Sequence, residues 1–323
     1  MRAFIFPGQG SQAVGMGLAL AQASAVARGV FEEVDEALGQ HLFRIMRDGP
    51  PGELMLTENA QPAIMANAVA TLRVLEREGG VRLADKAECV AGHSLGEYSA
   101  LCAADALDLS TTARLLKLRG QAMQAAVPVG EGAMAALLGT DLDKARTIAG
   151  AAIDSLLAEG TVDDGGDWVC TVANDNDPSQ VVISGHRVAV ERAVALAKEL
   201  GAKRALILPV SAPFHCPLMQ PAADAMDAAL AGADLRAPLV PLYCNVDAVA
   251  VADPGAIRAL LVAQVTGMVR WRESVLAMVD GGVTEFIEFG GKVLAPMVKR
   301  IAPDVTATSI VTMDDVEDLL KKM

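Results

Sequence analysis

The hydrophobic and polar positions of the chain follow two periods, one typical of strands and one typical of helices. Short apolar runs at residues 3–7 and just before the sequence "GHSLG" predict strands. Apolar residues three and four positions apart predict helices at about residues 16–38, 60–78 and 110–126, and another from about residue 96. Alternating strands and helices are typical of a parallel sheet covered by helices, so we predict an α/β fold.

The pattern changes after residue 131. Six elements follow in the order strand, helix, strand, strand, helix, strand: "GAMAALLG", residues 142–158, "WVCTVAN", "QVVISG", residues 187–200 and "AKRALIL". This order is that of the ferredoxin-like split βαβ arrangement. The turn-forming segments "VPVGEG" and "LPVSAP" flank it. We therefore predict a small subdomain at residues 128–205, inserted into a large subdomain formed by residues 1–127 and 206–323.

Composition excludes several classes of protein. The 323 residues are 52% hydrophobic, enough for one large core with a smaller satellite. The net charge of −13 argues against nucleic acid and anionic membranes, because phosphate binding depends on clustered Lys and Arg. Pro7 and Gly8 cut the first apolar run too short for a signal peptide, and no run reaches transmembrane length. Five scattered cysteines without a C-x-x-C motif indicate reduced thiols in a cytoplasmic protein, and no metal-ligand spacing occurs.

The sequence "GHSLG" at residues 92–96 matches the G-x-S-x-G motif. A predicted strand precedes it and a predicted helix follows it, so Ser94 is expected on a sharp strand-to-helix turn, the nucleophile elbow, with its hydroxyl exposed above the sheet. The N-terminus of the following helix favours developing negative charge at this place. The alternative is a structural serine that only caps the helix.

A serine hydroxyl needs a base to become a good nucleophile, and the chain has four histidines. His41 lies in an amphipathic segment, and His186 begins a predicted helix. His93 is adjacent to Ser94, so the two side chains should diverge. His215 lies in the loop "VSAPFHCPL", where a catalytic group is more typical. By elimination we predict His215 as the base.

The residues alone do not identify the group that orients His215. Asp247, in "CNVD", is one candidate, since hydrolases usually use a carboxylate for this role. A backbone carbonyl is the other, because it also accepts the Nδ1 proton.

The opening segment "FPGQGSQ" allows three interpretations: a phosphate-binding loop, a backbone site for an oxyanion, or an ordinary turn. Its glycines superficially match a dinucleotide fingerprint, but the acidic residues Glu32 and Glu33 lie in a helical pattern rather than after a second strand. No Gly-Lys-Ser/Thr follows, which excludes a P-loop. We therefore expect the amides of Gln9 and Leu95 to form an oxyanion hole.

At this point the sequence resembles the malonyl-CoA:acyl-carrier-protein transacylases of fatty-acid synthesis and the related acyltransferase domains of polyketide synthases. The resemblance covers nearly the whole chain and depends on eight segments in the family's order: "FPGQGSQ", "LTENAQPAI", "GHSLGEYSAL", "LRGQAMQ", "GAMAALLG", "QVVISGH", "PVSAPFHCPLM" and "GKVLAPMVKRI". It implies an α/β-hydrolase-like large subdomain that carries a ferredoxin-like small one.

The resemblance also implies roles for particular residues. Ser94 would be the acylated nucleophile, His215 the general base and acid, and the amides of Gln9 and Leu95 the oxyanion hole. The main-chain carbonyl of Gln264 would orient His215, in place of Asp247, although "TGM" stands nearby where an Asn-Pro pair is more usual.

Substrate-binding positions follow from the same resemblance. Arg119 would hold the malonyl carboxylate, for which a guanidinium fork is well suited, although a surface arginine lying along apolar neighbours is the simpler interpretation of its helix. Phe214 would limit space at the α-carbon, so methylmalonyl should be a poor substrate. Asn174, Asn176 and His93 are the remaining expected substrate-binding residues.

The expected partners are malonyl-CoA and acyl carrier protein, with no cofactor beyond the phosphopantetheine that the partner carries. Carrier protein is acidic in this family, so we expect it to dock on the local basic residues of the insert, Arg187, Arg192, Lys198, Lys203 and Arg204. A monomer is expected. The alternatives are a serine esterase or thioesterase, an acyltransferase of a polyketide or malonate pathway, and a non-catalytic scaffold.

Overall fold

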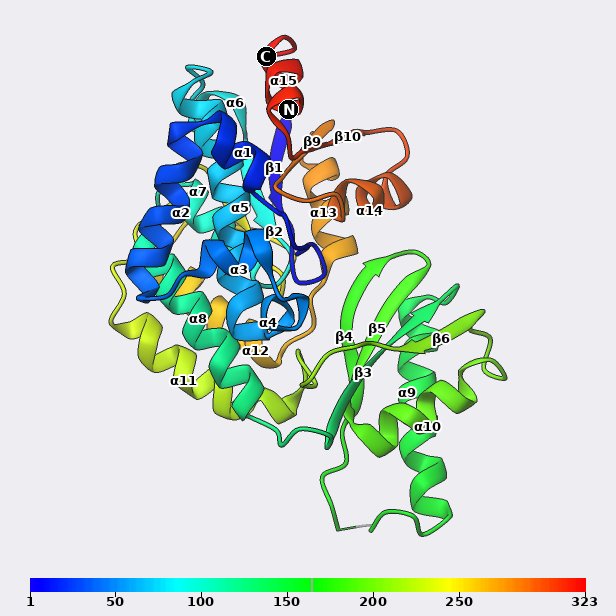
Figure 1. Ribbon diagram of the computed structural model, residues 1–323. Helices are drawn as coiled ribbons and strands as arrows, with labels where there is room; N and C mark the ends of the chain where they lie inside the picture. The colour runs from blue at the N-terminus through cyan, green and yellow to red at the C-terminus, as the bar shows by residue number, and fades with distance from the viewer. Residues whose placement is uncertain (164) are drawn as a thin grey trace.

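The computed structural model describes residues 1–163 and 165–323 and contains a large and a small subdomain (Figure 1). In the large subdomain a six-stranded sheet has the order β10-β9-β1-β2-β7-β8. Its strands are β1 (Arg2–Phe6), β2 (Cys89–Gly92), β7 (Leu242–Tyr243), β8 (Ala250–Val251), β9 (Glu285–Phe289) and β10 (Thr306–Ile310). All neighbouring pairs are parallel except β7 with β8, so the predicted parallel sheet is confirmed.

The central strand β1 is buried on both faces because helices cover both sides of the sheet. Successive side chains point to opposite faces, so Phe4 and Phe6 enter one core while Ala3 and Ile5 enter the other. The first core includes α2 (Ala25–Leu38), α5 (Thr57–Arg77), α7 (Gly96–Ala103) and α8 (Leu109–Ala125). The second includes α13 (Trp271–Asp280) and α14 (Leu294–Ile301).

The remaining helices of the large subdomain contribute buried side chains to the first core. They are α1 (Leu18–Ala23), α3 (Leu42–Asp48), α4 (Pro51–Met55), α6 (Leu83–Lys86), the short 3₁₀ helix η1 (Pro217–Met219), α11 (Gln220–Ala231), α12 (Pro254–Thr266) and α15 (Met313–Leu320). The helix expected at about residues 16–38 is two helices, because Ser24 has an extended backbone and its side chain accepts a hydrogen bond from the Ala27 amide. Ser24 therefore ends α1 and caps α2.

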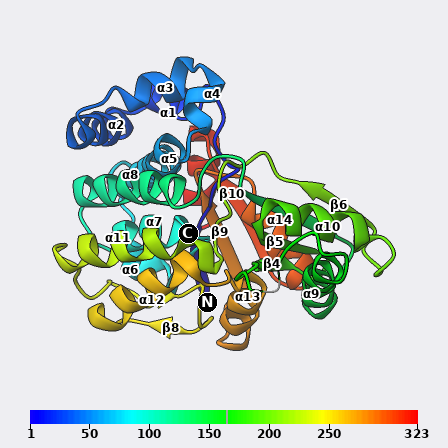
Figure 2. The same cartoon turned by 90° about the horizontal axis from the view of Figure 1, so that it is seen from below.

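The small subdomain is an antiparallel sheet of β3 (Gly132–Leu138), β4 (Cys170–Asp177), β5 (Gln180–His186) and β6 (Arg204–Ile207), in the order β4-β5-β3-β6. The helices α9 (Leu142–Ala158) and α10 (Arg187–Ala197) cover one face, over Ala135 and Ile183. The other face turns Met134 and Val182 toward the core of the large subdomain. Figure 2 shows α9 and α10 on the side away from the large subdomain. This agrees with the predicted ferredoxin-like order, and residues 128–205 stay its proposed bounds.

Strand β4 ties the small subdomain to the large one. The Asp175 amide donates to the Val269 carbonyl at 2.9 Å, and the carboxylates of Asp175 and Asp177 pair with Arg272 and Arg300, each at 2.8 Å. Both carboxylates are buried. Asn176 lies between these two carboxylates, and its Oδ1 is 2.8 Å from Nε2 of His93, which directly follows β2. Within the described residues, no helix is both long and apolar enough to cross a membrane.

Candidate active site

The turn between β2 and α7 holds Ser94 in a conformation that few residues adopt, with φ at 53°. Glycine is required on both sides of this turn, at positions 92 and 96, because any larger side chain would overlap neighbouring backbone. A Cβ atom on Gly92 would lie 1.9 Å from the Gly96 backbone, and one on Gly96 would lie 2.2 Å from the Phe6 carbonyl oxygen. The Ser94 amide donates to Asn245 Oδ1 at 2.7 Å, which helps to hold the turn. This geometry is that of a nucleophile elbow, as the motif predicts.

The structure brings His215 against this serine, with Ser94 Oγ 2.7 Å from His215 Nε2. The other ring nitrogen, Nδ1, lies 2.8 Å from the Gln264 carbonyl oxygen and 3.2 Å from that of Gly267. Carbonyl oxygens only accept, so Nδ1 carries the proton and Nε2 is free to accept the serine proton. Asp247 makes no such contact among the described residues. Burial, assisted by the charge of Arg119, lowers the pKa of His215 to about 3 and keeps the ring neutral.

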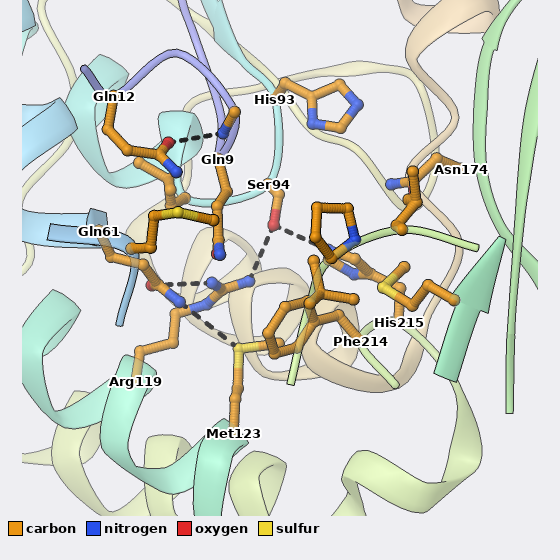
Figure 3. Close-up of a pocket in the computed structure, with 17 residues that line it drawn as sticks. Gln9, Gln12, Gln61, His93, Ser94, Arg119, Met123, Asn174, Phe214 and His215 are labelled. Carbon is orange, nitrogen blue, oxygen red and sulfur yellow. Dashed lines mark hydrogen bonds between the residues drawn. The ribbon is translucent and has the colours of Figure 1, made fainter. Parts of the chain in front are cut away.

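Arg119 lies in the interior, with an exposed fraction of 1%, so it is not a surface arginine. Its Nη1 donates to Gln61 Oε1 at 2.9 Å, and its Nη2 donates to Gln264 Oε1 at 2.8 Å and to Ser94 Oγ at 3.1 Å. Figure 3 shows the guanidinium pointing toward both Ser94 and Gln61. Its Nε has no hydrogen-bond partner in the described part of the chain. A buried cation without a bonded carboxylate can bind an anionic group of a substrate.

A cavity of about 440 Å³ lies next to this cluster (Figure 3). Eight predicted site residues line it: Gln9, His93, Ser94, Leu95, Arg119, Asn174, Phe214 and His215. Its wall also includes Gln61 and apolar side chains such as Met123, Met134 and Val210, which the sequence analysis did not single out. Gln61 belongs to the segment "LTENAQPAI", so its place in a family segment was the available signal.

Known proteins similar to this chain are acyl transferases, in agreement with this geometry. The acyl transferase domain family matches residues 3–292. The chain belongs to this family. It is 44% identical over 309 residues to the malonyl CoA-acyl carrier protein transacylase of Escherichia coli K12, covering 95% of each chain, and 42% identical over 300 residues to that of Bacillus subtilis, covering 93% of this chain and 90% of the other.

Solved structures agree with the fold of this acyl transferase. A crystal structure of an acyl-carrier-protein S-malonyltransferase from Bartonella henselae is 49% identical and superposes with a TM-score of 0.93, covering 99% of this chain and 98% of that one. A malonyl-transacylase in complex with a type II PKS acyl-carrier protein is 39% identical and superposes with a TM-score of 0.92. The match covers 100% of this chain and 99% of that one. The predicted fold class is confirmed, a parallel α/β core with a small antiparallel subdomain.

The two residues expected to form the oxyanion hole, Gln9 and Leu95, come from different loops of the acyl transferase. Gln9 follows β1 and Leu95 immediately precedes α7, and both residues line the cavity beside Ser94. Across residues 1–163 and 165–323, neither amide donates a hydrogen bond to another residue. The first turn of α7 adds the positive end of a helix dipole. The place is therefore suited to an oxyanion.

Asn176 and His93 form a pair of their own. His93 Nε2 lies 2.8 Å from Asn176 Oδ1, and burial lowers the pKa of His93. His93 and Asn174 line the cavity, whereas Asn176 does not. The structure thus places Asn176 behind His93, where it holds the imidazole in position.

Proposed function

We propose that this acyl transferase moves a malonyl group from malonyl-CoA to the phosphopantetheine thiol of acyl carrier protein and so supplies fatty-acid synthesis. The observation that carries the proposal is the buried Arg119, which reaches the hydroxyl of a serine already paired with a histidine. The relatives at 44% and 42% identity are named malonyl CoA-acyl carrier protein transacylases, which supports the same function.

The first half of the reaction uses Ser94 as nucleophile. His215 Nε2 accepts the Ser94 proton while Oγ attacks the thioester carbonyl carbon. The amides of Gln9 and Leu95 stabilise the oxyanion of the tetrahedral intermediate. The carbon–sulfur bond then breaks, His215 gives its proton to the CoA thiolate, and malonyl-Ser94 remains.

The second half repeats these steps with the carrier thiol. His215 takes the thiol proton, and the sulfur attacks the ester carbonyl of malonyl-Ser94. The bond to Ser94 Oγ breaks, and Oγ regains the proton from His215. The Gln264 and Gly267 carbonyls hold Nδ1–H throughout, so that the same tautomer serves both halves.

Substrate choice depends on the cation in the cavity. A malonyl carboxylate pairs with the Arg119 guanidinium, whereas an acetyl group leaves it without an anion. Phe214 lies beside His215 on the cavity wall and restricts space at the α-carbon. Asn174 contributes a polar group for the pantetheine arm.

Carrier docking is assigned to the basic residues of the small subdomain. Arg192 is held by Glu159 at 2.5 and 2.6 Å, and Arg187 donates to the Gly130 carbonyl at 2.6 Å. Lys203 and Arg204, at the start of β6, are both exposed and are the stronger candidates. Local charge of this kind speeds association with an acidic partner even when the net charge is negative.

A cytoplasmic location remains part of the proposal. It is supported by Cys89, Cys102, Cys170, Cys216 and Cys244, which are all buried and unbridged in the described structure. A monomer remains a prediction, which light scattering would test.

Incubation with radiolabelled malonyl-CoA tests the function. We expect a stable label on Ser94, none on Ser94→Ala, and its transfer when carrier protein is added. Rapid release of malonate without carrier protein would mean a hydrolase. No label on the unaltered protein would mean a scaffold.

A further inference from the structure

A buried carboxyl group, Glu97, lies behind the nucleophile elbow and takes part in none of the steps above. Its exposed fraction is 1%, and it belongs to no ion pair among the described residues. One oxygen, Oε1, accepts from the Asn245 amide at 2.6 Å, and the other, Oε2, accepts from Gln264 Nε2. Burial raises the pKa of Glu97 to about 8, while these two hydrogen bonds and the charge of Arg119 act against that rise. Burial of a carboxyl group in the interior costs folding free energy, so its presence here needs an explanation.

The side chain of Gln264 links this carboxyl to the active site. Its Oε1 accepts from Arg119 Nη2 at 2.8 Å, and its Nε2 donates to the Ser94 carbonyl at 3.0 Å as well as to Glu97. A guanidinium only donates and a carbonyl only accepts, so the amide can lie in one orientation only. Its Nε2 therefore faces Glu97, which has to be an acceptor.

Asn245 provides a second link. Its main-chain amide donates to Glu97, its Oδ1 accepts from the Ser94 amide at 2.7 Å, and its Nδ2 donates to the Gly92 carbonyl at 2.7 Å. Asn245 thus holds both sides of the strained turn at Ser94. Within residues 1–163 and 165–323, Glu97 accepts from both Asn245 and Gln264, each through a separate oxygen.

We propose that Glu97 is a positioning residue, a paired acceptor that orients the Gln264 amide toward Arg119 and anchors Asn245 beneath Ser94. The inference rests on the proposed function, because its main consequence is the placement of the cation that binds the malonyl carboxylate. An acceptor at both oxygens keeps Gln264 Oε1 toward the guanidinium. With one acceptor for two donors, either the Asn245 amide or Gln264 Nε2 faces an N–H group, which displaces the Asn245 main chain beneath Ser94 or the Gln264 amide from Arg119.

The test is Glu97→Gln, assayed above pH 8, where Glu97 is ionised and accepts at both oxygens, whereas a glutamine of nearly the same shape has one acceptor and one donor. We expect the ratio of malonyl to acetyl kcat/KM for acylation of Ser94 to fall about tenfold or more, because the misplaced guanidinium affects only the charged acyl group. The matched control is Glu288→Gln, another fully buried carboxyl, which accepts from the amides of Val293 and Ala295. It should lower the melting temperature and leave the ratio unchanged.

Equal loss of malonyl and acetyl transfer in Glu97→Gln, or an unchanged ratio, would overturn the inference. If Glu97→Gln does not fold, Gln264→Met is the second test, because it keeps the main-chain carbonyl at His215 and removes the side-chain link between Glu97 and Arg119. The same fall in the malonyl to acetyl ratio of kcat/KM is expected. An unchanged ratio there would also refute the role. Absence of malonyl-Ser94 in the unaltered protein would instead refute the proposed function, and the inference with it.

Discussion

Arg119 Nη2 lies 3.1 Å from Ser94 Oγ, so the hydroxyl that contacts His215 also accepts a hydrogen bond from a buried cation. Helix α8 supplies the cation and the turn before α7 supplies the hydroxyl. The positive charge therefore lies beside the oxygen that would carry the acyl group in the proposed reaction. This relationship leads to predictions about acyl choice, pH and stability.

Arg119→Ala should lose malonyl transfer and gain transfer of uncharged acyl groups. Removal of a charge-assisted contact costs about 1.5–3 kcal/mol, so kcat/KM for malonyl-CoA should fall about 10- to 100-fold or more. Acetyl-CoA should become relatively better, because no unpaired cation opposes it. Acyl-enzyme assays with both thioesters measure the change. Arg114→Ala, an exposed arginine on the same helix, is the control, and an unchanged acyl preference in Arg119→Ala would defeat the assignment.

Phe214→Ala should admit methylmalonyl-CoA. The ring lines the cavity next to His215, and its removal opens space at the α-carbon. We expect the ratio of methylmalonyl to malonyl kcat/KM to rise about tenfold or more, in the range that small changes of apolar volume produce. Competition between the two thioesters measures it. A ratio equal to that of the unaltered enzyme would remove Phe214 from substrate selection.

The acid limb of the pH profile should lie below the usual histidine range. Burial and the charge of Arg119 lower the pKa of His215 to about 3, so the free enzyme keeps a neutral base as the pH falls through 6.5, the ordinary pKa of histidine. The profile of kcat/KM reports the free enzyme. In Arg119→Ala the limb should move upward, because one of the causes that lower the pKa of His215 is removed. A limb at or above pH 6.5 in the unaltered enzyme would contradict the buried, neutral base.

The same pKa shift predicts a change in stability. The unfolded chain binds a proton at His215 near pH 6.5, whereas the native state does so only near pH 3. The native state is therefore stabilised relative to the unfolded state above pH 6.5, and this contribution is lost as the pH falls toward 3. His215→Gln should show a smaller loss of unfolding free energy across this window, measured by urea titration at each pH. Equal losses would mean that His215 is not the responsible group.

Reversal of the charges at Lys203 and Arg204 to Glu should raise KM for carrier protein and leave KM for malonyl-CoA unchanged. Both side chains are exposed at the start of β6, and charge reversal turns attraction into repulsion for an acidic partner. The control is the same reversal at Lys321 and Lys322, at the end of α15, which changes the net charge equally. Equal effects on both substrates, or equal effects of both pairs, would remove the docking proposal.

Gly92→Ala should destabilise the protein severely, whereas Gly150→Ala should stabilise it. A Cβ on Gly92 would overlap the Gly96 backbone, but around Gly150, within helix α9, nothing lies within 4 Å. A glycine in a helix interior costs about 0.5–1 kcal/mol relative to alanine, so Gly150→Ala should gain about that amount. Chemical denaturation measures both. A well-folded Gly92→Ala with full activity would contradict the elbow geometry.

The order of the elements was visible in the apolar pattern. Both sheets were predicted because the spacing of apolar residues reflects the face that each element buries. The spacing is two residues in a strand and three to four residues in a helix. Local chemistry also predicted the elbow, since "GHSLG" needs glycines on both sides of Ser94. With four histidines in the chain, the base was a choice by elimination. The helix break at Ser24 was missed, because its cap depends on one extended residue within a helical pattern.

Contacts between distant segments were beyond any local pattern. Asn176 was expected at the substrate but faces His93, because the two side chains meet across separate subdomains. The family resemblance implied that the Gln264 carbonyl orients His215, but no sequence pattern indicated that its side chain joins Arg119 to Glu97. Residue identity and spacing thus specified the strands, the helices, the elbow and the expected nucleophilic role of its serine, since these follow from neighbours along the chain. The partners of each buried polar group came from folding, since a hydrogen bond depends on distance and direction in space and not on separation in sequence.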